Sequence, residues 1–562
     1  MGEPGQALAV PEDFPVSWQH AEEAGLFWTR ESVHFPDPVV ALFDAFAQVH
    51  DAGFLAAFET YGVPVGAYHL RRINTYVYAS AEPLPLPGEE MRTRTRQAEE
   101  QLRSAASRLM ERWRGELLPE LEGHLAYWRS LRLGEVTQSQ LLDLLEDTLD
   151  RQRRLWEIHF LVMVPTLFAM SQFDEFYNEV LPGGDAFASY RLVQGLGNKT
   201  LEVDRALWQL GRMARDLEPV RRALDLPARE AVQRMGDSGE GRRFRQALDA
   251  FLARYGERGD HIMFSEPSWV EDPTTVLKNI RDFARDDARD PEAEWRQLSV
   301  ARERAIAECR QRLAAFPRPV IDEFENLLRC AQEATIISED HAHYIDHSGM
   351  YHLRRVLVEV GRRLARRGAI REPADVFMLR LDEIRAGLSA SDGADGFAPA
   401  VADRRAEMAH FARITPPPAL GTRPGEEPPQ DALTIAIGKF FGRPPEDPGD
   451  AEIVRGQPGS PGTARGTAKV VLSLTEAAKL QPGDVLVTPT TLPPWTALFA
   501  TAAAVVTDTG GVLSHCAIVA REYGIPAVVG TGRASSVLKD GDTVEVRGDQ
   551  GEVRVLARSR PA

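Results

Sequence analysis

Between residues 502 and 530, an apolar segment, a glycine turn, a short helical segment and a second apolar segment follow one another. The apolar residues 502–506 predict a buried strand, and the run after Gly524 predicts another. The residues between them, from about 514 to 523, predict a helix. Two buried strands joined by a helix require a sheet with a helix packed on it. The C-terminal part of the chain is therefore expected to form a small α/β domain.

A single histidine, His515, stands where the glycine turn becomes the helix. Gly510 and Gly511 permit a tight turn and a close approach of the backbone. The first amides of the helix and its dipole favour an anion at this end. A neutral imidazole is also nucleophilic at pH 7. These properties suit a histidine that carries a phosphoryl group, although a helix cap or a packed core residue is the commoner role for such a histidine.

The surrounding segments resemble the phosphohistidine motif of the phosphoenolpyruvate-utilising enzymes, which include phosphoenolpyruvate synthase, pyruvate phosphate dikinase, rifampin phosphotransferase and phenylphosphate synthase. The resemblance implies that His515 is transiently phosphorylated. It also implies that Gly510, Gly511, Ser514 and Arg521 support the phosphate site, although Arg521 could instead orient the helix or pair with Glu522 or Asp508. The resemblance runs without a break of register through residues 460–471 (SPGTARGTAKVV), 481–495, 510–530 and 538–556.

Two positions depart from the dikinase form of this motif. Dikinases usually have threonine two residues before the histidine and alanine directly after it, whereas this chain has Leu513 and Cys516. Rifampin phosphotransferases place an apolar residue at the first position and a hydroxyl residue directly before the histidine, as Ser514 is here. The departure weakens the resemblance to dikinases and leaves the carrier role of His515 intact.

Length and charge limit the class of protein. A chain of 562 residues is expected to form two or more domains. The net charge of −17 argues against nucleic acid or an anionic membrane as a partner. The three cysteines form neither a disulfide framework nor a zinc spacing, the N-terminus shows no signal peptide, and the most apolar run, residues 158–170, is too short to span a membrane. We expect a reduced, cytoplasmic protein.

Residues 1–412 are expected to form a large, mainly α-helical domain that binds the acceptor. Residues 413–450 are rich in proline, glycine and acids and predict a linker with one short element in ALTIAIGKFF. Residues 451–562 are expected to form the swivelling phosphohistidine domain. Within the helical region, a short strand is one option at residues 73–79. Helices are expected at about 89–133, from a cap at Thr137 onward, and at 200–224, 230–255, 290–316, 321–337 and 352–368.

The middle of the chain also resembles the substrate-binding domain of rifampin phosphotransferase-like enzymes. The resemblance is carried by residues 193–212, 251–280 and 372–388 and is patchier than around His515. It implies that the helical region binds a small molecule whose hydroxyl group accepts the phosphoryl group. Aromatic residues in this region would suit an aromatic or natural-product acceptor, but they equally suit an ordinary core.

No nucleotide-binding module is evident in the sequence. There is no Walker sequence and no glycine-rich phosphate loop in a β-rich context, and only six residues follow Leu556. Phenylphosphate synthase is divided between subunits in this way. We therefore expect a separate ATP-grasp partner that holds ATP and Mg²⁺ and phosphorylates His515, and no cofactor bound by this chain. The alternatives are a non-catalytic phosphocarrier or regulatory protein, and a fragment similar to phosphoenolpyruvate synthase.

The base that would activate the acceptor is expected in SEDHAHYIDHSGMYH, residues 338–352. In a helix, His343 and His347 would share one face, with Asp340 one turn before His343. This spacing suits a general base oriented by a carboxylate or, less well, a metal site, and we expect no metal. A polar helix face with chance clustering is the alternative. His261, beside Asp260, is a second candidate base.

Overall fold

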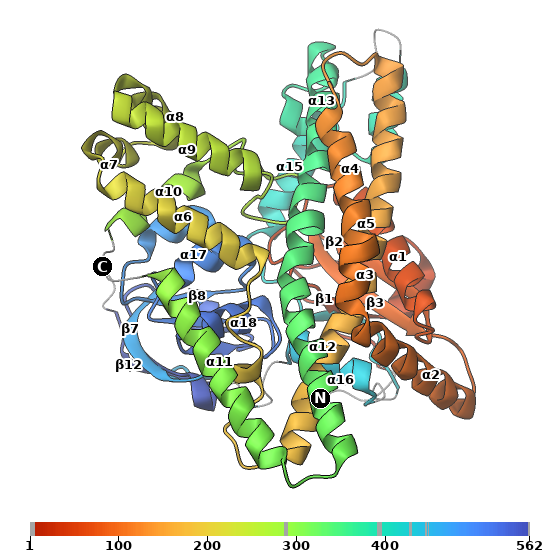
Figure 1. Cartoon of the computed structure of the whole chain (residues 1–562). Coiled ribbons are helices and arrows are strands. Elements are labelled where there is room, and N and C mark those ends of the chain that lie inside the picture. Colours follow the sequence, from red (N-terminus) through yellow and green to blue (C-terminus); the bar gives the residue numbers. More distant parts are fainter. Residues whose placement is uncertain are drawn as a thin grey trace. The chain divides into compact units, whose positions relative to one another are not determined.

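The computed structural model describes residues 6–285, 290–390, 396–425, 430–443, 447 and 449–559. The chain divides into two compact units (Figure 1). The first unit comprises Met1–Val164, Met263–Ser265 and Tyr344–Asp431; the second comprises Pro165–Ile262, Glu266–His343 and Ala432–Ala562. Among the described residues, no helix has both the length and the apolar composition that a membrane crossing requires.

The first unit contains a four-stranded antiparallel sheet in the order β2-β3-β1-β4. Its strands are β1 (Phe27–Arg30), β2 (Val65–Ile73), β3 (Tyr76–Pro83) and β4 (Ala419–Gly421). The short strand that was one option at residues 73–79 is confirmed in part: residues 76–79 belong to β3, whereas Ile73 ends β2 and a two-residue turn lies between the strands. Asn74 and Thr75 have φ angles of 48° and 69°, which form the tight turn of a hairpin.

Helices make up most of the rest of the first unit. The long helix expected at residues 89–133 is divided, because Arg108 leaves helical geometry (φ −116°, ψ 13°) and a π-helical turn follows at Trp113–Leu117. The α-helices of this unit are α1 (Phe43–Thr60), α2 (Gly88–Ser107), α3 (Leu109–Arg112), α4 (Leu118–Ser130), α13 (Met350–Arg366), α14 (Leu381–Ser389) and α15 (Ala398–Phe411).

Helix α5 (Gln138–Val180) contributes residues to both units. Thr137 caps it as predicted: its hydroxyl accepts the amide of Gln140 at 3.2 Å, and the Gln140 side chain accepts the amide of Thr137 at 2.8 Å. Pro165 lies inside the helix at the point where the first unit's residues end.

Most helices that precede the sheet of the second unit pack around two apolar clusters. One cluster contains Trp208, Phe244 and Phe251, and the other contains Phe173, Phe324 and Leu328. Asp290 caps the helix that begins at Pro291, near the start expected for it, since its carboxylate accepts the amides of Glu292 and Ala293. The α-helices are α6 (Lys199–Arg215), α7 (Glu218–Leu224), α8 (Ala228–Arg234), α9 (Gly239–Tyr255), α10 (Thr274–Arg285), α11 (Pro291–Leu313), α12 (Arg318–Ala342) and α16 (Ala432–Phe441).

The C-terminal part of the second unit is an eight-stranded mixed sheet in the order β5-β12-β11-β7-β8-β9-β10-β6. Strands β7 to β10 run parallel, and the strands outside them pair antiparallel. Helices α17 (Thr496–Phe499) and α18 (His515–Glu522) pack on one face. The strands are β5 (Ile453–Arg455), β6 (Gln457–Ser460), β7 (Thr463–Val470), β8 (Val485–Thr488), β9 (Ala504–Thr507), β10 (Ala527–Val529), β11 (Thr543–Arg547) and β12 (Glu552–Ala557).

The chain is thus mostly helical with a C-terminal α/β sheet region, as expected, but its N-terminal region also contains an antiparallel sheet. Residues 413–450, predicted as a linker, include β4 and α16. Helix α16 coincides with the short element expected in ALTIAIGKFF. The domain boundaries at residues 412 and 450 stay predictions.

Candidate functional site

His515 is the first residue of α18, the helix that connects the parallel strands β9 and β10. The preceding residue, Ser514, is extended (φ −69°, ψ 159°), and its carbonyl accepts the amide of Ile518 at 3.0 Å to open the helix. The histidine therefore lies beyond the carboxyl end of β9, where α/β sheets commonly place ligand sites. The predicted order of strand, turn, helix and strand is confirmed.

The two glycines before His515 allow a close backbone contact with α16. Gly510 has a φ of +90°, and a Cβ on Gly511 would lie 2.2 Å from the carbonyl oxygen of Lys439. The amide of Gly511 donates to the carbonyl of Phe440 at 2.8 Å, so this donor is already used within the protein. The phosphate-site role predicted for Gly510, Gly511 and Ser514 stays a prediction.

The imidazole of His515 contacts a carboxylate of the helical region. Its Nδ1 lies 3.3 Å from Oε1 of Glu339 on α12, and its Nε2 lies 3.5 Å from the hydroxyl of Thr496. The second oxygen of Glu339 accepts the hydroxyl of Thr200 at 2.8 Å. A carboxylate beside Nδ1 favours the tautomer with its proton on Nδ1, which leaves the lone pair on Nε2. This arrangement prepares Nε2 as the nucleophilic atom.

Glu339 is almost fully buried, with 5% of its surface exposed. Burial alone would raise the pKa of this carboxyl group, but the charge of His515 and the hydrogen bonds from His515 and Thr200 hold the pKa below its usual value. Glu339 therefore remains ionised at neutral pH and can stabilise a positive charge on the imidazole.

Glu339 was within the predicted ionisable segment but was not singled out. It follows Leu328, Ala331 and Thr335 at helical spacing, and all three are buried. An acidic residue on the apolar face of a helix is the signal that would have identified it. The spacing of the histidines in the sequence favours its neighbour Asp340 instead.

Asp340 has a structural partner. Its Oδ1 accepts the amide of Lys199 at 2.7 Å, at the first residue of α6, and burial raises the pKa of its carboxyl group to about 6. His343 opens a π-helical segment, His343–Gly349, and burial lowers its pKa to about 3, so it is neutral. His261 lies in the loop after α9 and makes no hydrogen bond or ion pair within the described residues. Neither His343 nor His261 is a hydrogen-bond partner of His515.

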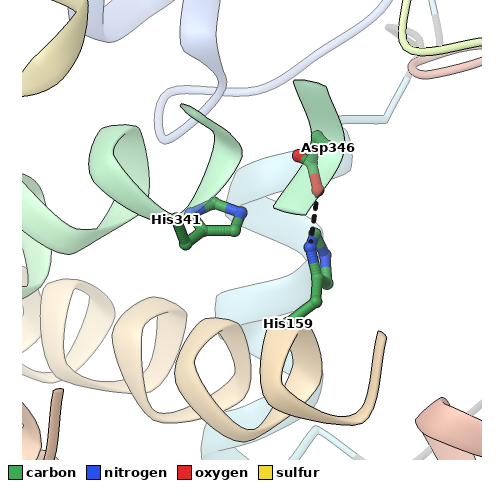
Figure 2. Close-up of side chains that lie close together, drawn as sticks. All are labelled: His159, His341 and Asp346. Atoms are coloured by element: carbon green, nitrogen blue, oxygen red, sulfur yellow. Dashed lines mark hydrogen bonds and ion pairs between the residues drawn. The ribbon is translucent and has the colours of Figure 1, made fainter. Parts of the chain in front are cut away.

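His347, the remaining acceptor-site candidate, is buried in the part of the π-helical segment that belongs to the first unit. Two other side chains of that unit form a carboxylate–histidine pair: Nδ1 of His159 lies 3.0 Å from Oδ1 of Asp346 (Figure 2). His341, also labelled there, belongs to the second unit, and its Nδ1 lies 3.0 Å from the carbonyl oxygen of Ile337, one turn earlier in α12.

The C-terminal end of α18 is fixed by Arg521, which is buried. Its guanidinium donates to the carbonyl oxygens of Gly459 at 2.8 Å and Val512 at 3.0 Å, and it lies 4.4 Å from the ring centre of Tyr190. Within the described part of the chain, Arg521 forms no ion pair with Glu522 or Asp508. These hydrogen bonds orient the helix and the loop before His515, and the phosphate-site role predicted for Arg521 stays a prediction.

Glu522 connects the same helix end to a glycine of the helical region. Both of its carboxylate oxygens accept the amide of Gly195, at 2.9 and 3.0 Å. Gly195 has a φ of +64°, and a Cβ there would lie 2.7 Å from the amide nitrogen of Ser299 on α11. Burial raises the pKa of Glu522 to about 7. Helix α18 thus contacts the helical region at both of its ends.

Comparison with known proteins matches both sides of the His515–Glu339 contact. Residues 159–339 match the family model of the rifampicin phosphotransferase fourth domain, and residues 480–551 match that of the mobile domain of PEP-utilising enzymes. The chain resembles the rifampicin phosphotransferases of the PEP-utilising enzymes. Glu339 and Thr200 lie in the fourth-domain match, and His515 lies in the mobile-domain match.

Individual relatives cover different shares of the chain. Chondramide synthase cmdD of Chondromyces crocatus is 37% identical over 560 residues, which are 98% of this chain and 14% of that protein. The uncharacterized phosphotransferase YvkC of Bacillus subtilis is 32% identical over 410 residues, 72% of this chain and 48% of that protein. A rifampicin phosphotransferase of Streptomyces sviceus is 33% identical over 325 residues, 56% of this chain and 35% of that protein. The chain spans less than half the length of each of these relatives.

The burial of Glu522 makes the stability of this mobile-domain region depend on pH, and the hydrogen bond from Gly195 opposes only part of the effect. Below its folded-state pKa of about 7 and above its ordinary value of about 4.3, Glu522 binds more protons in the folded than in the unfolded state. The free energy of unfolding contributed by this group therefore falls as pH rises through this window. We expect Glu522→Gln to be close to wild type at pH 5 and more stable than wild type at pH 8, by on the order of 2 kcal/mol.

Urea unfolding of both proteins at the two pH values measures this difference. Glu308→Gln, at an exposed position on α11, is the matched control and should show the same stability difference from wild type at pH 5 and pH 8. A Glu522→Gln effect that does not change between the two pH values would contradict the proton linkage.

Proposed function

We propose that this chain is a phosphotransferase whose His515 carries a phosphoryl group to the hydroxyl of a small molecule bound by the helical region. The observation that supports this most is the contact between His515 and Glu339, 3.3 Å between Nδ1 and Oε1. It joins the histidine of the mobile-domain match to a buried carboxylate of the fourth-domain match. A carrier histidine would meet such a residue when it delivers its phosphoryl group.

In the proposed step the phosphoryl group is bonded to Nε2, and Nδ1 keeps its proton, which forms a hydrogen bond to the Glu339 carboxylate. The P–Nε2 bond breaks while a P–O bond to the acceptor oxygen forms, and the electron pair of the broken bond returns to Nε2. The hydroxyl proton of the acceptor passes to Nε2, which leaves an imidazolium opposite the Glu339 carboxylate. Protonation at Nδ1 makes the ring a better leaving group, and the fixed carboxylate stabilises its positive charge throughout.

We propose that His515 is phosphorylated by an ATP-grasp module outside this sequence, on a partner subunit that holds ATP and Mg²⁺. The sequence contains no Walker sequence and no glycine-rich phosphate loop in a β-rich context. The rifampicin phosphotransferase of Streptomyces sviceus has 65% of its length outside the aligned region. This difference in length is consistent with a charging module located elsewhere.

The proposed acceptor is a small hydroxyl compound of the natural-product or aromatic type. The name of the rifampicin phosphotransferases states that they act on rifampicin, and the fourth-domain match covers residues 159–339 of this chain. For this chain the acceptor class is inferred from that similarity.

Labelled ATP tests the proposal. The purified chain should remain unlabelled when it is incubated alone with γ-labelled ATP and Mg²⁺, and should acquire acid-labile label at His515 when an ATP-grasp partner is added. Labelling of the chain alone would contradict the need for a partner. Addition of hydroxyl compounds to the labelled protein should then release the label as a phosphorylated product, whereas release only to another protein would show a phosphocarrier.

A further inference from the structure

The second unit contains a buried arginine, Arg258, whose charge has no direct partner in the described structure. Only 3% of its surface is exposed. Its Nε is buried without a hydrogen-bond partner, and within the described residues its guanidinium forms no ion pair. Its guanidinium carbon lies 5.6 Å from the ring centre of Trp269. Arginine is rarely buried unless it is paired, so an unpaired guanidinium in this position requires an explanation.

The backbone around Arg258 is firmly held. Its amide donates to the carbonyl of Tyr255 at 3.3 Å at the end of α9, and its carbonyl accepts the amide of Trp269 at 2.7 Å. Gly259 and Ser268 form an isolated bridge in the same loop. These backbone contacts therefore fix the position of Arg258 in the loop.

The two carboxylates that act on Arg258 are each bonded to other groups. Asp260 accepts the indole N–H of Trp269 at 2.7 Å and the hydroxyl of Thr275 at 2.6 Å. Glu339 accepts Thr200 and contacts His515. Burial lowers the pKa of Arg258 to about 10, and the charges of Glu339 and Asp260 oppose this effect, so the arginine stays charged at pH 7. The N–H groups of Arg258 therefore remain available to bind an anion, at a position close enough to Glu339 for the two charges to interact.

A phosphoryl group needs cationic donors on its oxygens during transfer. Within the described residues, the polar side chains that contact His515 are Glu339 and Thr496, and neither is a cation. The planar fork of arginine matches two oxygens of a phosphoryl group. We propose that Arg258 binds the phosphoryl group carried by His515, through two N–H donors, while His515 lies at Glu339. This inference rests on the proposed function and adds the residue that neutralises the transferred group.

Chemical phosphorylation tests Arg258 without the partner or the acceptor. The full chain is treated with phosphoramidate, a phosphoryl donor that needs no nucleotide, and phosphohistidine is followed by ³¹P NMR as a function of pH. The resonance of interest is the one that His515→Ala removes. We expect Arg258→Gln to raise the pH at which this phosphoryl group titrates by about one unit, because a nearby cation favours the dianion.

Two further variants separate this effect from a change in the fold. Arg258→Lys keeps a charge but loses the fork, and should give a smaller shift in the same direction. Arg212→Gln removes an exposed arginine that stacks on Trp208 at 4.9 Å, and should leave the titration unchanged. An Arg258→Gln titration equal to wild type would overturn the role of Arg258 while His515 remained a carrier. If His515→Ala removed no resonance, the carrier role itself would be contradicted.

Discussion

Replacing His515 with asparagine should abolish phosphoryl transfer, with a loss on the order of 10³-fold or more. Asparagine is short and polar, and its amide N–H can take the place of Nδ1 beside Glu339, 3.3 Å away in the native chain. It has no nucleophilic nitrogen to bond to phosphorus. The fold should survive, because the apolar residues of α18 that pack on the sheet, such as Ala517 and Val519, are unchanged.

The measurement is incorporation of label from ATP in the presence of the ATP-grasp partner, together with urea unfolding of the variant. His410→Asn, an exposed histidine at the end of α15, is the matched control and should incorporate label as wild type does. Full incorporation of acid-labile label by His515→Asn would show that another residue is the carrier.

Glu339→Gln should separate the phosphorylation of His515 from delivery to the acceptor. The partner should still phosphorylate His515, because Glu339 belongs to the helical region and not to the mobile-domain match. Delivery should fall about 100-fold, since a neutral amide can neither hold the proton on Nδ1 nor stabilise the imidazolium. Single-turnover transfer from the labelled protein to the acceptor measures the second step alone.

The neighbouring residue offers a matched control. Asp340→Asn makes the same change one position along α12, where the side chain accepts the amide of Lys199 at 2.7 Å and does not contact His515. We expect near-normal delivery and a loss of stability of about 1 kcal/mol. An equal fall in delivery for both variants would indicate a general disturbance of α12, and normal delivery by Glu339→Gln would remove Glu339 from the mechanism.

Local patterns in the sequence were sufficient to predict those elements whose structure depends on residues close together in the chain. The strand, glycine turn and helix around His515 follow from apolar runs and from the φ of +90° that Gly510 adopts. The start of α5 at Thr137 and the cap of Asp290 follow from hydrogen bonds to amides within the next three residues. The hairpin turn at Asn74–Thr75 was missed although its signal is also local, because residues 73–79 were interpreted as one strand.

The partners of the candidate site depend on contacts between residues far apart in the chain. Glu339 and Asp340 are adjacent acids, and only the packing of α12 decides that one contacts His515 while the other holds the start of α6. Arg258 is an ordinary charged residue in the sequence, and its importance comes from burial near Glu339 without a direct partner.

By itself, the sequence determined that His515 stands at the start of a helix after a glycine turn, and which family of proteins the chain resembles. The reason is that turn chemistry and apolar periodicity are properties of consecutive residues. Only the tertiary structure decided that Glu339 contacts His515, that Thr200 donates to Glu339 and that the charge of a buried arginine, Arg258, acts on the same carboxylate. Burial and distance set the charge and the proton position of each group, and both quantities exist only after the chain has folded.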